Sequence, residues 1–444
     1  MSLLLGIDLG TSYFKVGLFE PTGVLRGLGR VAVEPESPGP DRIELTVASF
    51  WERLRRALTA ALAEAGASAN EIAGISYSSQ ANTFVLLDAD GSELTPLVFW
   101  NDQRARSIAA SLVEFGDSPE RRRITGLTGI APGCAPAKWR WFAQHEPAVW
   151  SRTRHAMTIS DYLTFSLTGE RCGDAGTAAL TGLYSLPERA WWPEALEFFG
   201  IAPAKLSRPR PPGVPCGRTT ARAAELLGLR RDIPFAVGTL DHHAAALGSG
   251  IGTFADASLS TGTVLAALVL VDDVSPARGC IHGPDTDGKR YYRLAFDPAG
   301  AGQLEDYQRR FASDLTIEEL LSLAKICRAE PGRASGNHGA AVRALLERIV
   351  TAQCALLRTA AGAARVRTVA ATGGGARSPF LLQMQADFTG LPIVTSKTAE
   401  RACLGAALFA AVAAGFFSSI AEAARAMVRP SRTYTPDLQH HRKI

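Results

Sequence analysis

One motif restricts the fold of this chain more than any other: a hydrophobic strand that ends in an acid, followed by a hydroxyl-rich turn and an alternating strand. It opens the chain as "LLLGIDLGTSYFKVGLFE", where Asp8 ends the apolar run. The spacing of apolar residues predicts three strands, a helix and a further strand, at residues 3–8, 14–20, 24–33, 48–66 and 71–77. This βββαβ order with antiparallel leading strands excludes a Rossmann fold, in which strands alternate with helices.

The same motif returns in the second half of the chain, as "FADASLSTGTVLAALVLVDD". Here we expect a strand over 254–259, a Ser-Thr-Gly-Thr turn and a strand over 264–271. Hydroxyl and glycine residues at a tight bend present backbone N–H groups to an anion, which suits phosphate oxygens. Together the two copies predict an internal duplication with one phosphate-binding turn per half. An ordinary hairpin turn is the alternative for either turn taken alone.

Length and composition restrict the class of protein. A chain of 444 residues predicts two or three domains of about 150 residues each. The net charge of +4 is spread along the chain, so nucleic acid is not an expected partner. Seven cysteines without a CxxC spacing argue against a disulfide framework or a zinc site. The most apolar stretch, "ACLGAALFAAVAAGFF" near residue 402, is Ala-rich and interrupted by glycines, so we interpret it as a buried helix and expect no membrane span and a cytoplasmic protein.

A third glycine-rich segment, "TVAATGGGARSPF", predicts a strand, three glycines and a helix capped near Ser378 and Pro379. The glycines allow a base or ribose to lie against the backbone, and the helix N-terminus adds positive potential. Combined with the two hydroxyl turns, this segment favours nucleotide binding. The last residues, "RPSRTYTPDLQHHRKI", are expected to form a surface tail.

Two acids, Asp8 and Asp241, each end an apolar strand. Asp8 lies beside a phosphate turn and therefore suits Mg²⁺, which takes one or two carboxylates and keeps much of its hydration. Asp241, predicted in the other half, suits the base that accepts a proton from a hydroxyl attacking the γ-phosphate. A helix follows Asp241 directly, so a role as helix N-cap is the alternative.

Two polar segments, "SSQAN" at 78–82 and "FWNDQRA" at 99–105, combine amides, an indole, a carboxylate and a guanidinium. Sugars are bound by such mixtures, because planar polar groups hydrogen-bond neighbouring hydroxyls while an aromatic face covers the C–H side. The alternatives are that Trp100 is a core residue and that Arg104 is a structural ion-pair partner of Asp102. His242, next to the predicted base, is expected to touch the substrate.

In this order, the segments resemble the FGGY family of carbohydrate kinases, within the actin-like ATPase superfamily, over nearly the whole chain. The resemblance is carried by "GIDLGTSYFKVGLFEPTG", "GISYSSQANTFVLLDADGSELTPLVFWNDQRA", "ISDYLTFSLTGE", "VGTLDHHAAALGSG", "LSTGTV", "TGGGARSPFLLQMQADFTGLPIV" and "ACLGAALFAAVAAG". It implies an α/β fold of two RNase-H-like domains, each a mixed five-stranded sheet flanked by helices, with an interdomain cleft. The implied domains are 1–236 on the sugar side and 237–444 on the nucleotide side.

The resemblance also implies an activity, the ATP- and Mg²⁺-dependent phosphorylation of a hydroxyl of a ketose or related polyol. By position, Asp8 matches the metal-linked acid and Asp241 the catalytic base. The nucleotide contacts that it implies are Thr11, Ser12, Gly262, Thr263, Gly374, Gly375 and Ser378. The substrate-side positions are Gln80, Asn82, Trp100, Asp102 and His242. It leaves the number of subunits open, with a homodimer as one alternative.

The chain departs from the family at three places. Ala81 and Asn82 replace the Arg-Glu pair of glycerol kinases, so glycerol is not the expected substrate. Asn82 and His242 replace the residues of xylulokinases, so xylulose is not specified. Residues 311–339 are too few for a Pro-, Gly-, Glu- and Arg-rich segment that the family usually carries there. Two other hypotheses therefore stand beside the kinase: a catalytically weak sugar-sensing relative, and an actin-like ATPase acting on a protein partner.

Overall fold

The computed structural model describes residues 2–113, 115, 118–262, 264–274, 279–298, 300, 302–327 and 337–437. It contains two compact units. Unit 1 comprises Met1–Gly248, Val271–Tyr292 and Glu400–Val428, and unit 2 comprises Ser249–Leu270, Arg293–Ala399 and Arg429–Ile444. The chain thus returns to unit 1 twice after leaving it, whereas the sequence suggested one boundary, at 236/237, which stays a prediction.

The first sheet belongs to unit 1 and has the strand order β14-β15-β6-β1-β2-β3, with β16 also paired to β6. Its strands are β1 (Leu3–Leu9), β2 (Tyr13–Phe19), β3 (Leu25–Ala32), β6 (Ile72–Ser79), β14 (Pro215–Arg218), β15 (Pro234–Ala236) and β16 (Thr239–Leu240). The predicted opening strands therefore exist within a residue or two of their expected bounds. β1 pairs antiparallel with β2 and parallel with β6.

The second sheet has the order β19-β20-β18-β17-β21-β22-β23. Its strands are β17 (Ala257–Thr261), β18 (Leu265–Val271), β19 (Cys280–Pro284), β20 (Tyr291–Asp297), β21 (Val369–Thr372), β22 (Ile393–Ser396) and β23 (Pro430–Tyr434). β17 pairs antiparallel with β18 and parallel with β21, as β1 does with β2 and β6. The predicted hydroxyl-turn hairpin therefore recurs with the same strand pairing.

Both sheets contain the same five-strand arrangement, β3-β2-β1-β6-β15 and β20-β18-β17-β21-β22. This repetition supports the predicted duplication and the five-stranded core of each domain. Further strands are added to each core: β14 lies beside β15 and β16 beside β6 in the first sheet, and β19 lies beside β20 in the second. Another such strand, β23, pairs with β22. The prediction of a surface tail is therefore wrong for residues 430–434, whose mostly exposed side chains concealed a strand.

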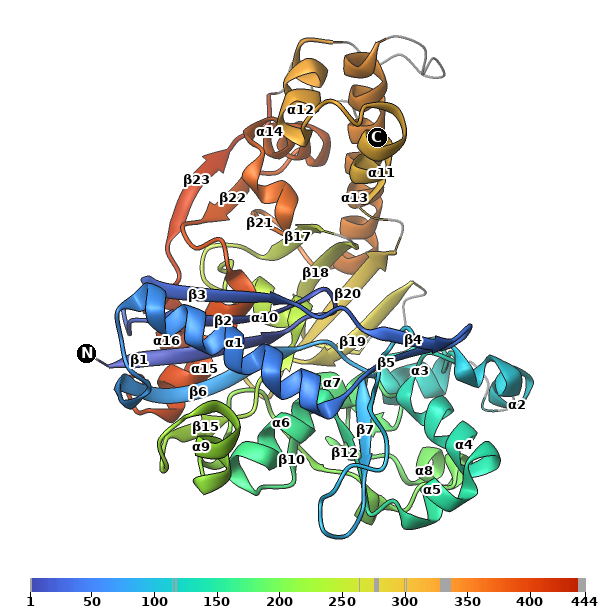
Figure 1. Ribbon diagram of the computed structural model, residues 1–444. Helices are drawn as coiled ribbons and strands as arrows, with labels where there is room; N and C mark the ends of the chain where they lie inside the picture. Colours follow the sequence, from blue (N-terminus) through green and yellow to red (C-terminus); the bar gives the residue numbers. More distant parts are fainter. Residues whose placement is uncertain are drawn as a thin grey trace. The chain divides into compact units, whose positions relative to one another are not determined.

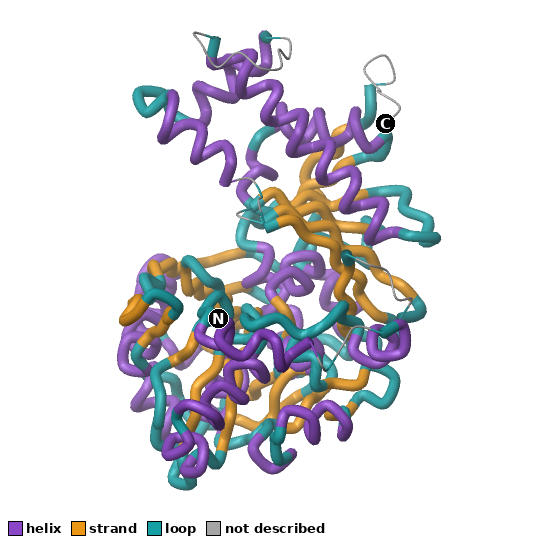
Figure 2. Tube along the Cα trace, turned by 90° about the vertical axis from the view of Figure 1, so that its right-hand side faces the viewer, coloured by secondary structure: helices purple, strands orange, loops and turns teal. Residues whose placement is uncertain are grey.

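Unit 1 carries a third sheet, of order β4-β5-β8-β7-β9. Its strands are β4 (Glu36–Gly39), β5 (Arg42–Leu45), β7 (Phe84–Leu87), β8 (Leu97–Val98) and β9 (His155–Thr158). The helices of the two units include α1 (Val47–Ala65), α4 (Ala135–His145), α5 (Pro147–Arg152), α6 (Ile159–Thr168), α10 (Asp241–Leu247), α13 (His338–Ala361), α14 (Pro379–Thr389) and α15 (Arg401–Ala413). Within each unit, helices lie against strands (Figure 2). Over the described ranges, every helix is too short or too polar to cross a bilayer.

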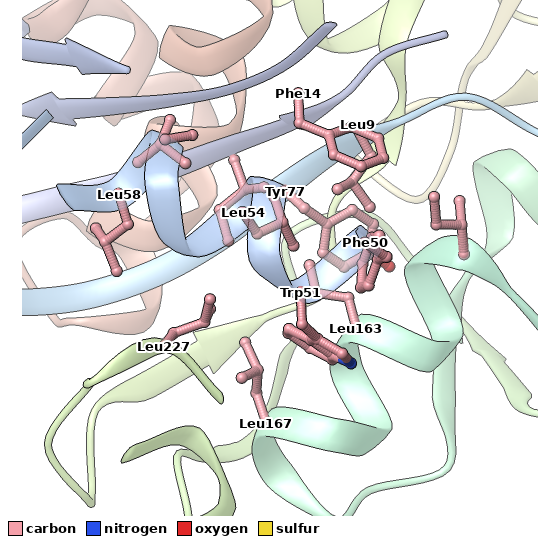
Figure 3. Packing of buried hydrophobic residues seen from close by; sticks show 14 of the residues in the cluster. Leu9, Phe14, Phe50, Trp51, Leu54, Leu58, Tyr77, Leu163, Leu167 and Leu227 are labelled. Carbon is pink, nitrogen blue, oxygen red and sulfur yellow. The ribbon is translucent and has the colours of Figure 1, made fainter. Parts of the chain in front are cut away.

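Helix α1 covers one face of the first sheet and forms the main core of unit 1 (Figure 1). It begins at Thr46, whose side chain caps Ser49 N, and ends at Gly66 in the left-handed region. Its apolar side chains Phe50, Trp51, Leu54 and Leu58 belong to one buried cluster with Phe14 and Tyr77 (Figure 3). Phe14 and Phe50 meet edge to face with ring centroids 5.5 Å apart. This packing fixes the strands that carry the site.

Helix α15 lies on the other face of the first sheet, in contact with β1. The approach is so close that a Cβ on Gly6 would lie 2.1 Å from the carbonyl oxygen of Cys403. Side chains alternate between the two faces of a strand, so Asp8, two residues after Gly6, lies on the α15 face. The sheet therefore presents Asp8 at its carboxyl edge, away from the α1 core.

Candidate active site

Asp8 and Asp241 lie at the same edge of one sheet. Asp8 of β1 is in register with Ser78 of β6, and Ser78 is in register with Thr239 of β16. Asp241 follows β16 directly as the first residue of α10. Because the three strands are parallel, their carboxyl ends meet at one edge, where ligands of α/β folds bind. Both acids belong to unit 1, whereas the sequence analysis placed Asp241 in the second half.

The carboxylate of Asp8 is buried, with 5% of the residue exposed. Ser78 donates a hydrogen bond to its Oδ1 at 3.0 Å, and Lys15 Nζ lies 3.4 Å from its Oδ2. Burial raises the pKa of Asp8, Lys15 opposes the rise, and the negative charge of Asp241 adds to it. Asp241 therefore adds negative charge at the strand edge that carries Asp8.

Lys15 holds two acids at once. Its Nζ lies 3.2 Å from Glu400 Oε2 as well as near Asp8. Burial lowers the pKa of Lys15, but the carboxylates of Asp8 and Glu400 outweigh burial and raise it. The sequence analysis missed Lys15, although it lies opposite Asp8 in the opening hairpin. Its ammonium group offsets part of the negative charge that Asp8 and Asp241 bring to this edge.

Asp241 is half-buried and begins α10. Its Oδ1 accepts a hydrogen bond from the backbone N–H of His242 at 2.7 Å. The residue in the N-cap position of α10 is Leu240, so the N-cap alternative does not apply. His242 is half-buried as well, beside the carboxylate that it contacts through its backbone.

His243, on the next position of α10, forms a buried polar chain that the sequence analysis missed. Its Nδ1 lies 3.1 Å from Thr239 Oγ1 and its Nε2 lies 3.1 Å from Asp285 Oδ1. Arg290 pairs with the second oxygen of Asp285 at 3.1 Å. Burial raises the pKa of Asp285, but the bond from His243 and the charge of Arg290 outweigh it and lower the pKa. This chain ties the first turn of α10 to the strand before it.

Thr11, Gln80 and Trp100 meet in one polar cluster of unit 1. Trp100 Nε1 donates to Thr11 Oγ1 at 2.9 Å, and Thr11 lies 3.4 Å from Gln80 Oε1. Thr83 Oγ1 donates to the same Gln80 oxygen at 3.1 Å and accepts from Trp100 N at 3.0 Å. Trp100 is 41% exposed, so it is not a core residue. Ser12, the next residue of the turn, is exposed.

The side chains of Asn82 and Asp102 already have hydrogen-bond partners within the protein. Asn82 Oδ1 accepts from Ala135 N at 2.9 Å and Nδ2 donates to Leu180 O at 3.0 Å. Asp102 is fully buried, and both of its oxygens accept from the Arg104 guanidinium at 2.9 Å. The structure thus favours the ion-pair alternative for Asp102 and Arg104. A direct sugar contact from either Asn82 or Asp102 stays a prediction that these bonds do not favour.

In unit 2, the triple-glycine turn packs against the end of β17. A Cβ on Gly373 would lie 2.5 Å from Thr261 O, and one on Gly375 would lie 2.6 Å from Thr261 Cβ. A Cβ on Gly374 would meet nothing within 4 Å, so packing does not require a glycine there. The predicted cap is confirmed, because Ser378 is the N-cap of α14 and Pro379 follows.

The second hydroxyl turn rests on a buried amide network. Nε2 of Gln353 on α13 donates to Thr261 Oγ1 at 2.7 Å, and Nε2 of Gln385 on α14 donates to it at 3.0 Å. Gly262 follows Thr261 at the turn and is half-buried. Thr263, the other predicted residue of this turn, lies outside the described residues. Across the part of the chain that is described, we find no group of three or more His, Cys, Asp or Glu side chains arranged to hold a metal ion.

Comparisons with known proteins match this fold. The model of the FGGY family of carbohydrate kinases, N-terminal domain, matches residues 3–248, and the C-terminal domain model matches residues 331–414. The L-xylulose/3-keto-L-gulonate kinase of Escherichia coli K12 is 28% identical, and the alignment covers 98% of this chain and 93% of that protein. A xylulose kinase of Staphylococcus epidermidis is 27% identical over 99% of this chain and 93% of its own length. The crystal structure of a ligand-bound xylulose kinase from Lactobacillus acidophilus superimposes with a TM-score of 0.87 at 21% identity, covering 99% and 95% of the two chains.

Proposed function

Because the chain belongs to the FGGY family of carbohydrate kinases, we propose that it transfers the terminal phosphoryl group of ATP to a hydroxyl group of a ketose or related polyol. One observation carries the proposal: Asp8 and Asp241 lie at the same edge of one sheet, at the ends of strands that are in register. Phosphoryl transfer needs a group that neutralises phosphate charge and a base that takes the acceptor proton, and two neighbouring carboxylates suit these roles.

In this proposal Asp241 is the general base. Its carboxylate is half-buried at the start of α10, and one oxygen is already held by His242 N. The sugar hydroxyl transfers its proton to Asp241 as its oxygen attacks the γ-phosphorus, and the bond to the β-phosphate oxygen breaks to release ADP. The chain of His243, Thr239 and Asp285 orients the turn that presents Asp241.

Asp8 suits a role in holding Mg²⁺, directly or through water. The observation that favours a cation here is that Asp8 and Asp241 bring two carboxylates to one strand edge, where a divalent ion would offset part of their charge. Mg²⁺ in proteins takes one or two carboxylates and completes its shell with water and phosphate oxygens, so three protein ligands are not required. Bound Mg²⁺ would neutralise negative charge on the transferring phosphate.

The sugar side of the proposal uses Gln80, Trp100 and His242. Trp100 keeps an exposed indole face, and Gln80 comes from the polar turn after β6. Both named relatives act on ketoses by their titles, which supports a ketose here. The nucleotide side uses the hydroxyls of Thr11 and Ser12, together with Gly262, Gly374, Gly375 and Ser378. Among these, Gly374 has no atom within 4 Å of an added Cβ, and Gly262 has only ordinary contacts at 3.8 Å, so packing does not require either glycine.

The test is a substrate screen with ADP detection. Wild-type protein with ATP and Mg²⁺ is offered pentuloses, hexuloses, deoxyketoses and tetritols, and we expect ADP to form only with particular ketoses or polyols. Sugar binding by calorimetry without ADP formation would instead indicate the sensing relative. ATP hydrolysis at a rate that no sugar changes would indicate the actin-like ATPase.

A further inference from the structure

Lys138 is a buried lysine that the proposed chemistry does not use. It lies on the first turns of α4, and its side chain has no exposed surface. A lysine side chain is rarely fully buried, because removing an ammonium group from water is costly unless partners compensate. The position therefore calls for a reason that packing alone does not supply.

The amine of Lys138 joins two segments that are distant in sequence. Nζ donates to the carbonyl oxygen of Phe99 at 2.6 Å and to the carbonyl oxygen of Asn82 at 3.2 Å. Asn82 belongs to the turn between β6 and β7, and Phe99 follows β8 directly. We call these two segments, residues 80–83 and 99–102, the sugar loops. One side chain thus holds the backbone of both.

The sugar loops also contact each other and α4. Trp100 N donates to Thr83 Oγ1 at 3.0 Å, and Ala135 N, at the start of α4, donates to Asn82 Oδ1 at 2.9 Å. Asn82 holds a left-handed backbone conformation, with φ of 64°, which asparagine adopts more readily than most residues, and its side-chain amide bonds the backbone of Ala135 and Leu180. Lys138 therefore occupies the point where the two loops and the helix converge.

We propose that Lys138 is a positioning residue, which holds Gln80 and Trp100 at the separation that the sugar requires by binding the carbonyls of Asn82 and Phe99. This inference rests on the proposed function and adds the residue that sets its substrate site. The amine touches neither sugar nor phosphate in this role. Its effect is on sugar affinity, because both of its partners are loop carbonyls.

The surroundings of the amine explain why a lysine serves here. Burial lowers the pKa of Lys138 to about 7; the negative charge of Asp102 opposes this shift, and the positive charge of Arg104 adds to it. An amine keeps two N–H donors even when it is neutral, and it uses two. The anchor therefore survives deprotonation, while the flexible stem of lysine reaches both carbonyls from one helix position.

The experiment compares Lys138→Met with Lys205→Met. Methionine fills a similar volume without a donor, so both loop carbonyls lose their partner. Lys205 is the matched control: its Nζ also donates to a backbone carbonyl in unit 1, that of Thr153, which lies on neither sugar loop. For Lys138→Met we expect the KM for the sugar to rise about tenfold, while the KM for ATP stays within about twofold. Lys205→Met should leave both values unchanged.

Hydrogen–deuterium exchange of the same variants measures how firmly the backbone of the sugar loops is held, and it does not depend on activity. Exchange in residues 80–83 and 99–102 should quicken in Lys138→Met and stay at the wild-type rate in Lys205→Met. Equal rises in both KM values, or loop exchange that matches wild type, would overturn the proposal. If Lys138→Met does not fold, Lys138→Gln keeps an amide donor, and an intermediate rise in sugar KM is expected. Absence of turnover in the wild type would contradict the proposed function instead. Hydrogen–deuterium exchange of the two loops would still show whether Lys138 holds them.

Discussion

The indole Nε1 of Trp100 donates a hydrogen bond to Thr11 Oγ1 at 2.9 Å. This hydrogen bond joins Trp100, a predicted contact of the sugar, to Thr11, a predicted contact of the nucleotide phosphates. The two residues are far apart in sequence, and no local pattern connects them. A predicted sugar contact and a predicted nucleotide contact of unit 1 therefore share a hydrogen-bonded cluster, and we expect a change at either residue to affect the other.

Trp100→Phe tests this connection. Phenylalanine keeps an aromatic face but removes the indole donor, so the loss is one neutral hydrogen bond of about 1 kcal/mol. We expect the KM for the sugar to rise about fivefold, with a smaller rise for ATP through Thr11. Steady-state kinetics with each substrate varied in turn measures both. Trp150→Phe, on α5, is the control and should change neither; a Trp100→Phe enzyme with wild-type constants would contradict the link.

Asp241→Asn tests the base. Asparagine preserves the size of the side chain and its contact with His242 N, but it cannot take a proton. We expect kcat to fall about 10²- to 10⁴-fold, with nucleotide affinity nearly unchanged. Rapid-quench turnover and nucleotide titration measure the two properties. Asp314→Asn, an exposed acid of unit 2, provides the matched substitution. Wild-type turnover in Asp241→Asn would remove this residue from the mechanism.

Asp8→Asn tests the metal role. Loss of one carboxylate weakens the cation at this edge, so the Mg²⁺ concentration for half-maximal activity should rise about tenfold. The measurement is a Mg²⁺ titration at fixed ATP. Glu20→Gln removes an acid in the turn after β2 that pairs with Arg26 at 3.0 Å, and it should not shift the titration. An unchanged Mg²⁺ requirement in Asp8→Asn counts against the assignment.

His243 and Asp285 should act as a pair. His243→Leu leaves Asp285 buried without its ring donor, which costs about 2 kcal/mol of unfolding free energy and lowers kcat by releasing the first turn of α10. Urea unfolding and kinetics of both single variants and of the double variant His243→Leu/Asp285→Leu form a cycle. Because the two residues share one bond, the losses should be less than additive; strict additivity would show that they act independently.

Stability should rise with pH through Lys138. Burial disfavours the charged amine, so its pKa is about 7 in the folded protein. In the unfolded chain the pKa lies near its ordinary value of 10.5. Between these values the unfolded state binds more protons, so stability increases as pH rises and is lost as pH falls towards 7. The groups that face the amine are Asp102, Cys134 and Arg104. Relative to Lys138→Met, wild type should gain up to about 1.4 kcal/mol per pH unit between pH 7.5 and 9. Urea unfolding at several pH values measures the difference, and parallel curves would contradict it.

Local patterns in the sequence predict much of this fold. Alternating apolar residues and turn glycines locate β1, β2, β3 and α1 within a residue or two. They also reveal the repeated hairpin at β17 and β18, because strand periodicity and turn chemistry depend on neighbouring residues. The pattern fails at β23, whose exposed side chains carry no hydrophobic alternation.

For the candidate site, the sequence predicts some residues but not the contacts that those residues make. Strand ends and polar turns predict Asp8, Asp241, Gln80 and Trp100 as site residues, and all four lie in unit 1. The bonds that employ Asn82 and Asp102 in holding backbone were not predicted, since their partners Ala135 and Ile43 lie in other elements. Lys138 carried no signal of its own, because a lysine in a helix is normally a surface residue.

By itself, the sequence determined the strands, the turns and the acids at the strand ends, because each depends on residues adjacent along the chain. Only the tertiary structure decided which of these residues lie at the same edge of a sheet and which side chains hydrogen-bond the backbone. It also decided that a buried lysine joins two loops. The physical reason is that such contacts depend on the register and packing of segments far apart in sequence, which no local pattern specifies.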